Sequence, residues 1–175
     1  MKAGGGRNKG NAFERKLANE VVTAFSCFGI KKSDCYRTPL SGGHIHAKQS
    51  DPGDLVISKR LRKYFPFHVE AKHYRQVSLN ALFTPIEKQK KAWKFKPWVE
   101  QVGRAKKHGL TPVIVFKENN GPILAMLPMY PPLTDTRIIF KTRYKGEPWY
   151  VITFKSMLRI LVKRGWELKA RPTHD

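Results

Sequence analysis

The sequence contains few residues for a soft-metal site, a disulfide framework or a membrane span. Only two of its 175 residues are cysteines, Cys27 and Cys35, and no CxxC pair is present. An iron–sulfur cluster needs more thiolates, and so does a structural zinc site unless histidines complete it. No apolar run approaches the ~18 residues of a membrane-spanning helix. The cysteine content predicts a reducing, intracellular setting.

Acidic residues are also scarce, which indicates the kind of partner. Lys and Arg together number 34 against 13 Asp and Glu, so the formal net charge is +21. The basic residues are spread along the chain instead of lying on one amphipathic helix, which favours nucleic acid over a membrane surface. Hydrophobic residues make up 41% of the chain, enough for a core. We expect a flexible basic arm over residues 1–10 that contacts phosphates, followed by one domain over residues 11–175.

The hydrophobic periodicity predicts helices and strands in mixed order. Phe13, Leu17, Val21 and Phe25 recur every four residues, as on one face of a helix. The same reasoning predicts helices over residues 11–25, 76–82, 97–108 and 155–164, and strands over residues 54–58, 67–73, 111–117, 122–127, 137–144 and 149–154. This order predicts an α/β or α+β fold in which a mixed sheet is flanked by helices.

Two of the few acids fall where a hard metal ion would bind. Asp54 opens one predicted strand, and Glu70 and Lys72 lie two apart in the next. Because side chains alternate along a strand, Glu70 and Lys72 share a face, and a hairpin between the strands would bring Asp54 beside them. The two carboxylates and the Ala71 carbonyl suit Mg²⁺, and the Lys72 ammonium would orient the attacking water or stabilise charge at the phosphoryl group. Asp51 competes for the ligand role, but it precedes a Pro-Gly turn.

Glu14 is a further candidate with three interpretations. It lies off the apolar stripe of the first helix, so it can face the strand edge and bind a second metal ion or a metal-bound water. It also falls three residues after Asn11, where the acid of a capping box would lie if Asn11 is the N-cap. A solvated pair with a nearby lysine is the third interpretation. The sequence leaves all three open.

These residues and their surroundings resemble a known group of nucleases. The matching segments are Lys9–Arg15, Ser41-Gly42-Gly43, Asp51–Asp54, Glu70-Ala71-Lys72 and a stretch from Trp98 through Gln101 to Lys117. Together they resemble the PD-(D/E)xK nuclease superfamily, in its archaeal-type and phage Holliday junction resolvase branch. The resemblance implies a restriction-endonuclease-like fold. It also implies a homodimer that cuts four-way DNA junctions with Mg²⁺, or with Mn²⁺ in its place.

The resemblance also implies roles for single residues. The implied catalytic residues are Glu14, Asp54, Glu70, Lys72 and Ser41, and the first three of these are the implied metal ligands. Ser41 would lie in a loop near the scissile phosphate. Arg15 would support the site or the DNA backbone, and Gln101 would face the active site from a helix.

Other basic residues are candidates for DNA contacts. Lys91 and Lys94 alternate with Trp93 and Phe95, as in grooves that stack unpaired bases. The complete set of predicted DNA contacts is Arg15, Arg37, Arg60, Arg62, Lys63, Lys91, Lys94 and Gln101. His44 and His46 lie in a predicted loop, where they would join a metal site, act as a general base or, more commonly, be solvated.

The sequence therefore predicts a Mg²⁺-dependent endodeoxyribonuclease for branched DNA, in the host-cell cytoplasm if a phage encodes it. Two alternatives stay open. One is a restriction-like, homing or single-strand DNA nuclease of the same fold. The other is a non-catalytic basic nucleic-acid-binding protein. The second alternative is disfavoured, because two acids in a DNA-facing site weaken binding unless a metal ion neutralises them.

Overall fold

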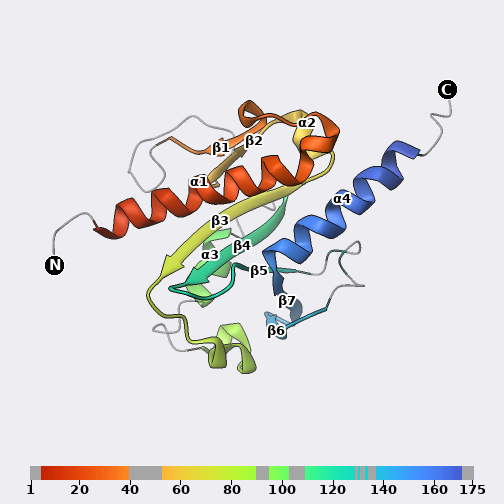
Figure 1. Ribbon diagram of the computed structural model, residues 1–175. Helices are drawn as coiled ribbons and strands as arrows, with labels where there is room; N and C mark the ends of the chain where they lie inside the picture. The colour runs from red at the N-terminus through yellow and green to blue at the C-terminus, as the bar shows by residue number, and fades with distance from the viewer. Residues whose placement is uncertain are drawn as a thin grey trace.

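A five-stranded mixed sheet separates two layers of helices (Figure 1). The computed structural model describes residues 5–39, 53–89, 95–102, 109–128, 130, 133 and 137–170. The helices are α1 (Gly5–Phe25), α2 (Lys59–Arg62), α3 (Phe95–Val102) and α4 (Phe154–Ala170). The strands are β1 (Cys35–Arg37), β2 (Leu55–Ile57), β3 (Phe67–Tyr74), β4 (Thr111–Glu118), β5 (Leu124–Pro128), β6 (Phe140–Tyr144) and β7 (Glu147–Thr153).

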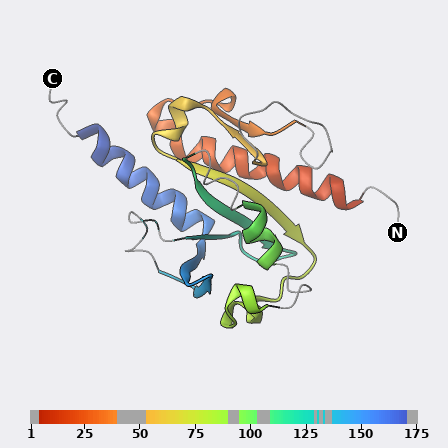
Figure 2. The same ribbon diagram turned by 180° about the vertical axis from the view of Figure 1, so that it is seen from behind.

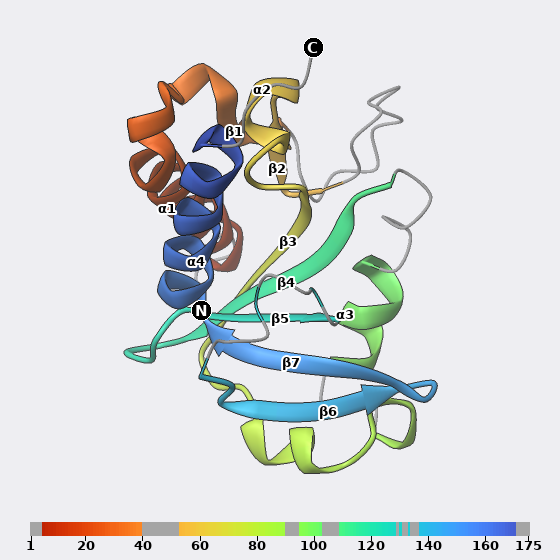
Figure 3. The same cartoon turned by 90° about the vertical axis from the view of Figure 1, so that its right-hand side faces the viewer.

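The strand order in the large sheet is β3-β4-β5-β7-β6. β3 and β4 are parallel, and the other neighbours are antiparallel. Helices α1 and α4 lie in front of this sheet in Figure 1, and α3 lies in front of it in the reverse view of Figure 2. Figure 3 shows the same two layers from the side. The observed architecture confirms the predicted mixed sheet flanked by helices.

The sheet has an apolar core on each face. Along β4, Val113 and Val115 belong to the cluster beneath α1 and α4, whereas Ile114 and Phe116 belong to a second cluster beneath α3. All four are buried, because helices or turns cover both faces of this central strand. The side chains of β3 are divided between the same two faces, so the face of a residue decides which of the two helix layers it meets.

β1 and β2 form a separate two-stranded antiparallel sheet beside β3. The predicted hairpin between β2 and β3 is therefore wrong, since α2 lies between the two strands and they belong to different sheets. One backbone hydrogen bond still joins the two sheets, from the Asp54 N–H to the Val69 carbonyl at 2.9 Å. The start of β2 thus lies against the middle of β3.

The first helix is longer than predicted. It begins at Gly5 instead of Asn11, so residues 5–10 are helical, although we expected them to belong to a flexible arm. A tertiary contact supports this first part of α1, because the Lys9 ammonium donates to the Asn119 side chain at 2.5 Å. Glu14 consequently lies well inside the helix, and its interpretation as part of a capping box is wrong.

The other elements keep their predicted order with shifted ends. α4 continues to Ala170 past the predicted end at residue 164, and the predicted helix over residues 76–82 is the 3₁₀ turn Leu79–Phe83. Cys27 and Cys35 are free thiols. In the described part of the chain, no helix is both long and apolar enough to cross a bilayer.

Candidate active site

Asp54 is held against the edge of β3 by its neighbours. The Ala71 N–H donates to the Asp54 carboxylate at 2.7 Å, in addition to the backbone bond from Asp54 to Val69. The Thr38 hydroxyl donates to the carbonyl of Gly53 at 2.7 Å. A Cβ at position 53 would lie 3.0 Å from the Val69 carbonyl oxygen, so any other residue would push the two segments apart by a few tenths of an ångström. These contacts fix the Asp54 carboxylate beside the middle of β3.

Glu70 and Lys72 lie on the α3 face of the same strand. In the register with β4, Glu70 is opposite Ile114 and Lys72 is opposite Phe116, and both partners belong to the core beneath α3. The Lys72 ammonium donates to Oε1 of Glu70 in a close ion pair. The two side chains are only 18% and 4% exposed, so the pair is largely desolvated. The alternation of side chains predicted this shared face.

Gln101 reaches the ion pair from α3. Its Nε2 donates to the same Oε1 of Glu70 at 2.5 Å, and its Oε1 accepts a hydrogen bond from the Lys72 ammonium at 3.3 Å. Trp98 and Val102 are buried in the core beneath α3, which anchors the helix that carries Gln101. A neutral amide thus contacts both charged groups and restricts their positions without changing the charge of the site.

The Asp54 carboxyl is the group whose ionisation the site perturbs most clearly. Burial, followed by the negative charge of Glu70, raises the pKa of Asp54 to about 7. The hydrogen bond from the Ala71 N–H and the charge of Lys72 act in the opposite direction but do not compensate. Two carboxylates in a poorly solvated site are difficult to ionise together. A cation beside Asp54 is therefore favoured.

Glu14 is held by an arginine on the side of α1 that faces β1. Nε of Arg37 donates to the Glu14 carboxylate at 2.6 Å, and Nη2 of Arg37 donates to the Asn11 side chain at 2.8 Å. Glu14 is only 8% exposed, which excludes the solvated lysine pair. Its charge contributes to the raised pKa of Asp54, so Glu14 lies near the site. Its role as a metal ligand stays a prediction.

Comparison with known proteins places the chain in a family. The family model described as phage putative PDDEXK endonuclease matches residues 5–163. The chain belongs to this family. The match confirms the predicted PD-(D/E)xK superfamily and the predicted restriction-endonuclease-like fold, and it supports a phage origin. No curated protein and no solved structure matched the chain.

The donor set at the edge of β3 suits a hard divalent cation. Among the described residues, no three His, Cys, Asp or Glu side chains are grouped so as to hold a metal ion by themselves. Mg²⁺ does not require such a group, since proteins usually bind it through one or two carboxylates, with waters and substrate phosphates as the other ligands. Asp54 and Glu70 provide two such carboxylates, and their mutual repulsion favours a cation. The residues present therefore fit a divalent metal ion.

The predicted DNA contacts of the PDDEXK endonuclease lie in several places. Gln101 is in the site. Arg60 and Arg62 lie in α2 and donate to the backbone carbonyls of Phe28 at 3.4 Å and Ile57 at 3.1 Å. Arg60 is exposed, as are Lys63, beside α2, and Arg15, on the side of α1 that faces α4. Arg37 is the partner of Glu14. As DNA contacts these residues stay predictions. The predicted site residues outside the described part of the chain are Ser41, His44, His46, Asp51, Lys91, Trp93 and Lys94.

Three residues that shape the site were not assigned these roles from the sequence. They are Asn11, which we expected to be an N-cap, and Thr38 and Gly53, which hold the segment of Asp54. The glycine directly before the aspartate was the available signal, because it marks a place where the backbone approaches another element closely. His68 is buried 3.2 Å from the position of a Cβ at Gly53, so it contributes packing behind this segment.

Proposed function

We propose that this PDDEXK endonuclease is a Mg²⁺-dependent or Mn²⁺-dependent homodimer that cleaves branched DNA, with four-way junctions as its preferred substrate. One observation carries the proposal. Lys72 and Gln101 contact the same carboxylate oxygen of Glu70, and Asp54 is fixed on the edge of the same strand. An ammonium held next to two carboxylates at a sheet edge suits the hydrolysis of a phosphodiester bond.

Each group has a distinct role in this proposal. The Asp54 and Glu70 carboxylates and the Ala71 carbonyl would hold the metal ion, which would supply charge neutralisation at the phosphoryl group and activation of a water. Lys72 orients the attacking water or stabilises the negative charge that develops on the phosphoryl oxygens. Gln101 keeps Lys72 and Glu70 in their relative positions, because it bonds to both.

The charge of the chain supports DNA as the substrate. A net charge of +21 favours binding to a polyanion, and contacts to phosphates would dominate the affinity. Binding should therefore weaken steeply as salt is added. A phage protein of this kind would meet its DNA inside the infected host cell.

The preference for branched DNA is supported by the resemblance of the chain to junction resolvases. The matching segments include Lys9–Arg15, Asp51–Asp54 and Glu70–Lys72. A four-way junction has two-fold symmetry, and a two-fold symmetric dimer presents two equivalent sites to opposite strands. This geometry would produce paired, symmetric nicks.

The test compares a labelled four-way junction with a linear duplex of matched sequence. Both are incubated with the protein in Mg²⁺, in Mn²⁺ and in EDTA. We expect symmetric nicks in the junction alone, and only when a metal ion is present. Sedimentation of the protein with the junction reports whether two copies bind.

Other results would select the alternatives. Equal cleavage of the duplex would keep the nuclease and its site but discard the junction preference. Binding without cleavage in either metal ion would discard the catalytic proposal in favour of a non-catalytic DNA-binding protein.

A further inference from the structure

At the carboxyl ends of β3 and β4, the sheet face beneath α1 changes from apolar to basic. Val113 and Val115 are fully buried on this face. Lys117 is the next residue of β4 on the same face, and it is only partly buried. His73 lies directly opposite Lys117 in the register of the two strands. An imidazole and an ammonium therefore stand side by side where the sheet extends beyond its core.

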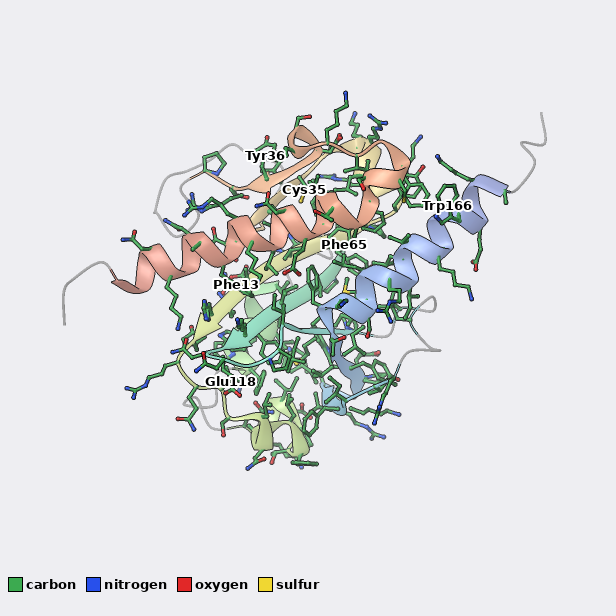
Figure 4. All side chains as sticks on the ribbon, viewed as in Figure 1. Phe13, Cys35, Tyr36, Phe65, Glu118 and Trp166 are labelled. Carbon is green, nitrogen blue, oxygen red and sulfur yellow. The ribbon has the colours of Figure 1, made fainter. Side chains whose placement is uncertain are left out.

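The first part of α1 extends over this end of the sheet (Figure 1). Lys9 donates to the Asn119 side chain, which links α1 to the turn after β4. One turn later in α1, the ring of Phe13 contacts the ring of His73 with 5.2 Å between centroids. Figure 4 shows Phe13 on α1 near the end of the sheet that Glu118 marks on β4. We call the group that these contacts bring together the basic cluster: Lys9, His73, Lys117 and Asn119.

The charges in the basic cluster have the same sign. Burial, followed by the charges of Lys9 and Lys117, lowers the pKa of His73. Hydrogen bonding to the Lys9 backbone and the Asn119 side chain acts in the opposite direction. Two ammonium groups near one imidazole repel each other, and an anion between them would remove this repulsion. An ammonium has three N–H donors, and Asn119 accepts only one of those of Lys9.

The basic cluster lies beside the proposed active site on the same strand. His73 follows Lys72 directly, ~3.3 Å further along β3, and its side chain points to the opposite face. Within the large sheet β3 is an edge strand. A DNA backbone that lies along this edge would meet Lys72 from one face of the sheet and the basic cluster from the other.

We propose that Lys9 and Lys117 bind a DNA backbone phosphate that neighbours the scissile phosphate, and that His73 and Asn119 hold Lys9 in position for this contact. The inference rests on the proposed function, because it names where the same site binds the strand that it cuts.

The test is a scan of the DNA with single methylphosphonates, each of which removes the charge of one phosphate. Binding of each modified junction is measured in EDTA over a range of salt concentrations, so that cleavage does not interfere. For the wild type we expect one position next to the cut at which the modification lowers the slope of log K against log salt by about 0.9. Lys9→Ala and Lys117→Ala should each lose the sensitivity to this position while keeping it elsewhere.

Lys16→Ala is the matched control, since it removes one lysine from an exposed position on the same helix. It should keep the complete wild-type pattern, including the position next to the cut. Lys9→Arg and Lys117→Arg retain the charge and should restore the pattern. Circular dichroism verifies that each variant is folded.

The inference and the proposed function can fail separately. If Lys9→Ala and Lys117→Ala both keep the full wild-type pattern, the basic cluster does not bind a phosphate and the inference is overturned, even if the wild type cuts the junction. If the wild type does not cut in Mg²⁺ or Mn²⁺, the proposed nuclease activity fails. In that case, the phosphate contact would still be supported if both lysine variants lost the sensitivity of binding to a methylphosphonate at the same position.

Discussion

The edge of β3 and the groove between α1 and α4 both contain a lysine–glutamate pair, but in different surroundings. Lys72 and Glu70 are 18% and 4% exposed at the edge of β3, where Gln101 bonds to both. Lys16 and Glu20 are 55% and 35% exposed in the groove, and 3.9 Å separates their charged atoms. The residues that line the groove include basic side chains and the apolar Ile123 and Leu158, whereas the charged groups at the edge are bonded to one another.

The difference shows why charge alone does not locate the active site of a chain with 34 Lys and Arg residues. An exposed pair is solvated and screened, so it contributes little to stability and is not confined to one geometry. A desolvated pair must be fully bonded to persist, and its atoms are then held in one geometry. The predictions below contrast these two regions, from the largest expected effect to the smallest.

Replacing the glutamate of each pair by glutamine should lower the cleavage rate in only one of the two cases. Glu70→Gln removes one carboxylate from the proposed metal site, so single-turnover cleavage in Mg²⁺ should fall by about 10³-fold or more. Glu20→Gln should leave the rate unchanged. Cleavage of the wild-type substrate by Glu70→Gln at the wild-type rate would place the active site elsewhere.

The raised pKa of Asp54 predicts how pH affects the protein. An aspartate with a pKa of 3.8 when unfolded and about 7 when folded keeps a proton in the folded state that the unfolded state has released. In EDTA, this group therefore makes the folded protein less stable as the pH rises from about 4 to about 7. Mg²⁺ binding should strengthen over the same range, by up to about ten-fold per pH unit, because it displaces one proton.

Asp54→Asn provides the control for this prediction. Thermal unfolding in EDTA measures the stability, and calorimetric titration measures the affinity for Mg²⁺. The variant should lack the contribution of Asp54 to both pH profiles. If wild type and variant show the same pH dependence, the ionisation of Asp54 is not coupled to folding or to metal binding.

Gln101 should matter through the groups that it holds. Gln101→Ala leaves all charged groups in place but removes the hydrogen bonds to Glu70 and Lys72, so we expect a loss of about 10- to 100-fold in the rate or in metal affinity. Gln101→Glu adds a negative charge next to Glu70, and it should restore neither the cleavage rate nor the metal affinity. A wild-type rate for Gln101→Ala, measured at saturating Mg²⁺ and at low Mg²⁺, would show that Lys72 and Glu70 do not need this support.

The Arg37–Glu14 pair should contribute to stability because it is largely buried. Arg37→Ala leaves the Glu14 carboxylate without its 2.6 Å partner, which should cost about 2–3 kcal/mol of unfolding free energy in urea titrations. The double variant Arg37→Ala, Glu14→Gln should recover part of this loss. Additive effects of the two substitutions would mean that the residues do not interact.

The exposed pair gives the smallest effect, since Lys16→Ala should change the unfolding free energy by less than about 0.5 kcal/mol.

Part of the arrangement at the edge of β3 could be predicted from the sequence. Period-two alternation placed Glu70 and Lys72 on one face of β3, and the acid at the start of the preceding strand lies beside them as expected. The resemblance to nucleases added Gln101, which no local pattern would select on a helix far along the chain. Long-range pairing was less predictable: Asp54 reaches β3 from a separate small sheet, through the backbone contact that Gly53 permits.

The errors lie where tertiary contacts override local signals. The glycine-rich start of the chain has low helix propensity, so we expected an arm, but the first part of α1 is fixed on the sheet by Lys9 and Phe13. The spacing of Asn11 and Glu14 fits a capping box, yet both side chains bind Arg37 from β1. A local pattern of two residues has no information about a partner that lies 23 residues further along the chain.

Single-turnover cleavage by Lys72→Ala and Lys16→Ala tests the central claim most directly. Both variants lose one lysine from a lysine–glutamate pair, and both are compared with the wild type on the DNA that the wild type cuts best, in Mg²⁺ and in EDTA. The account predicts that Lys72→Ala binds this DNA but cuts it at least about 10³-fold more slowly, whereas Lys16→Ala cuts at the wild-type rate and neither cuts in EDTA. A wild-type rate for Lys72→Ala, or cleavage that persists in EDTA, would contradict the assignment of a metal-dependent active site to the edge of β3.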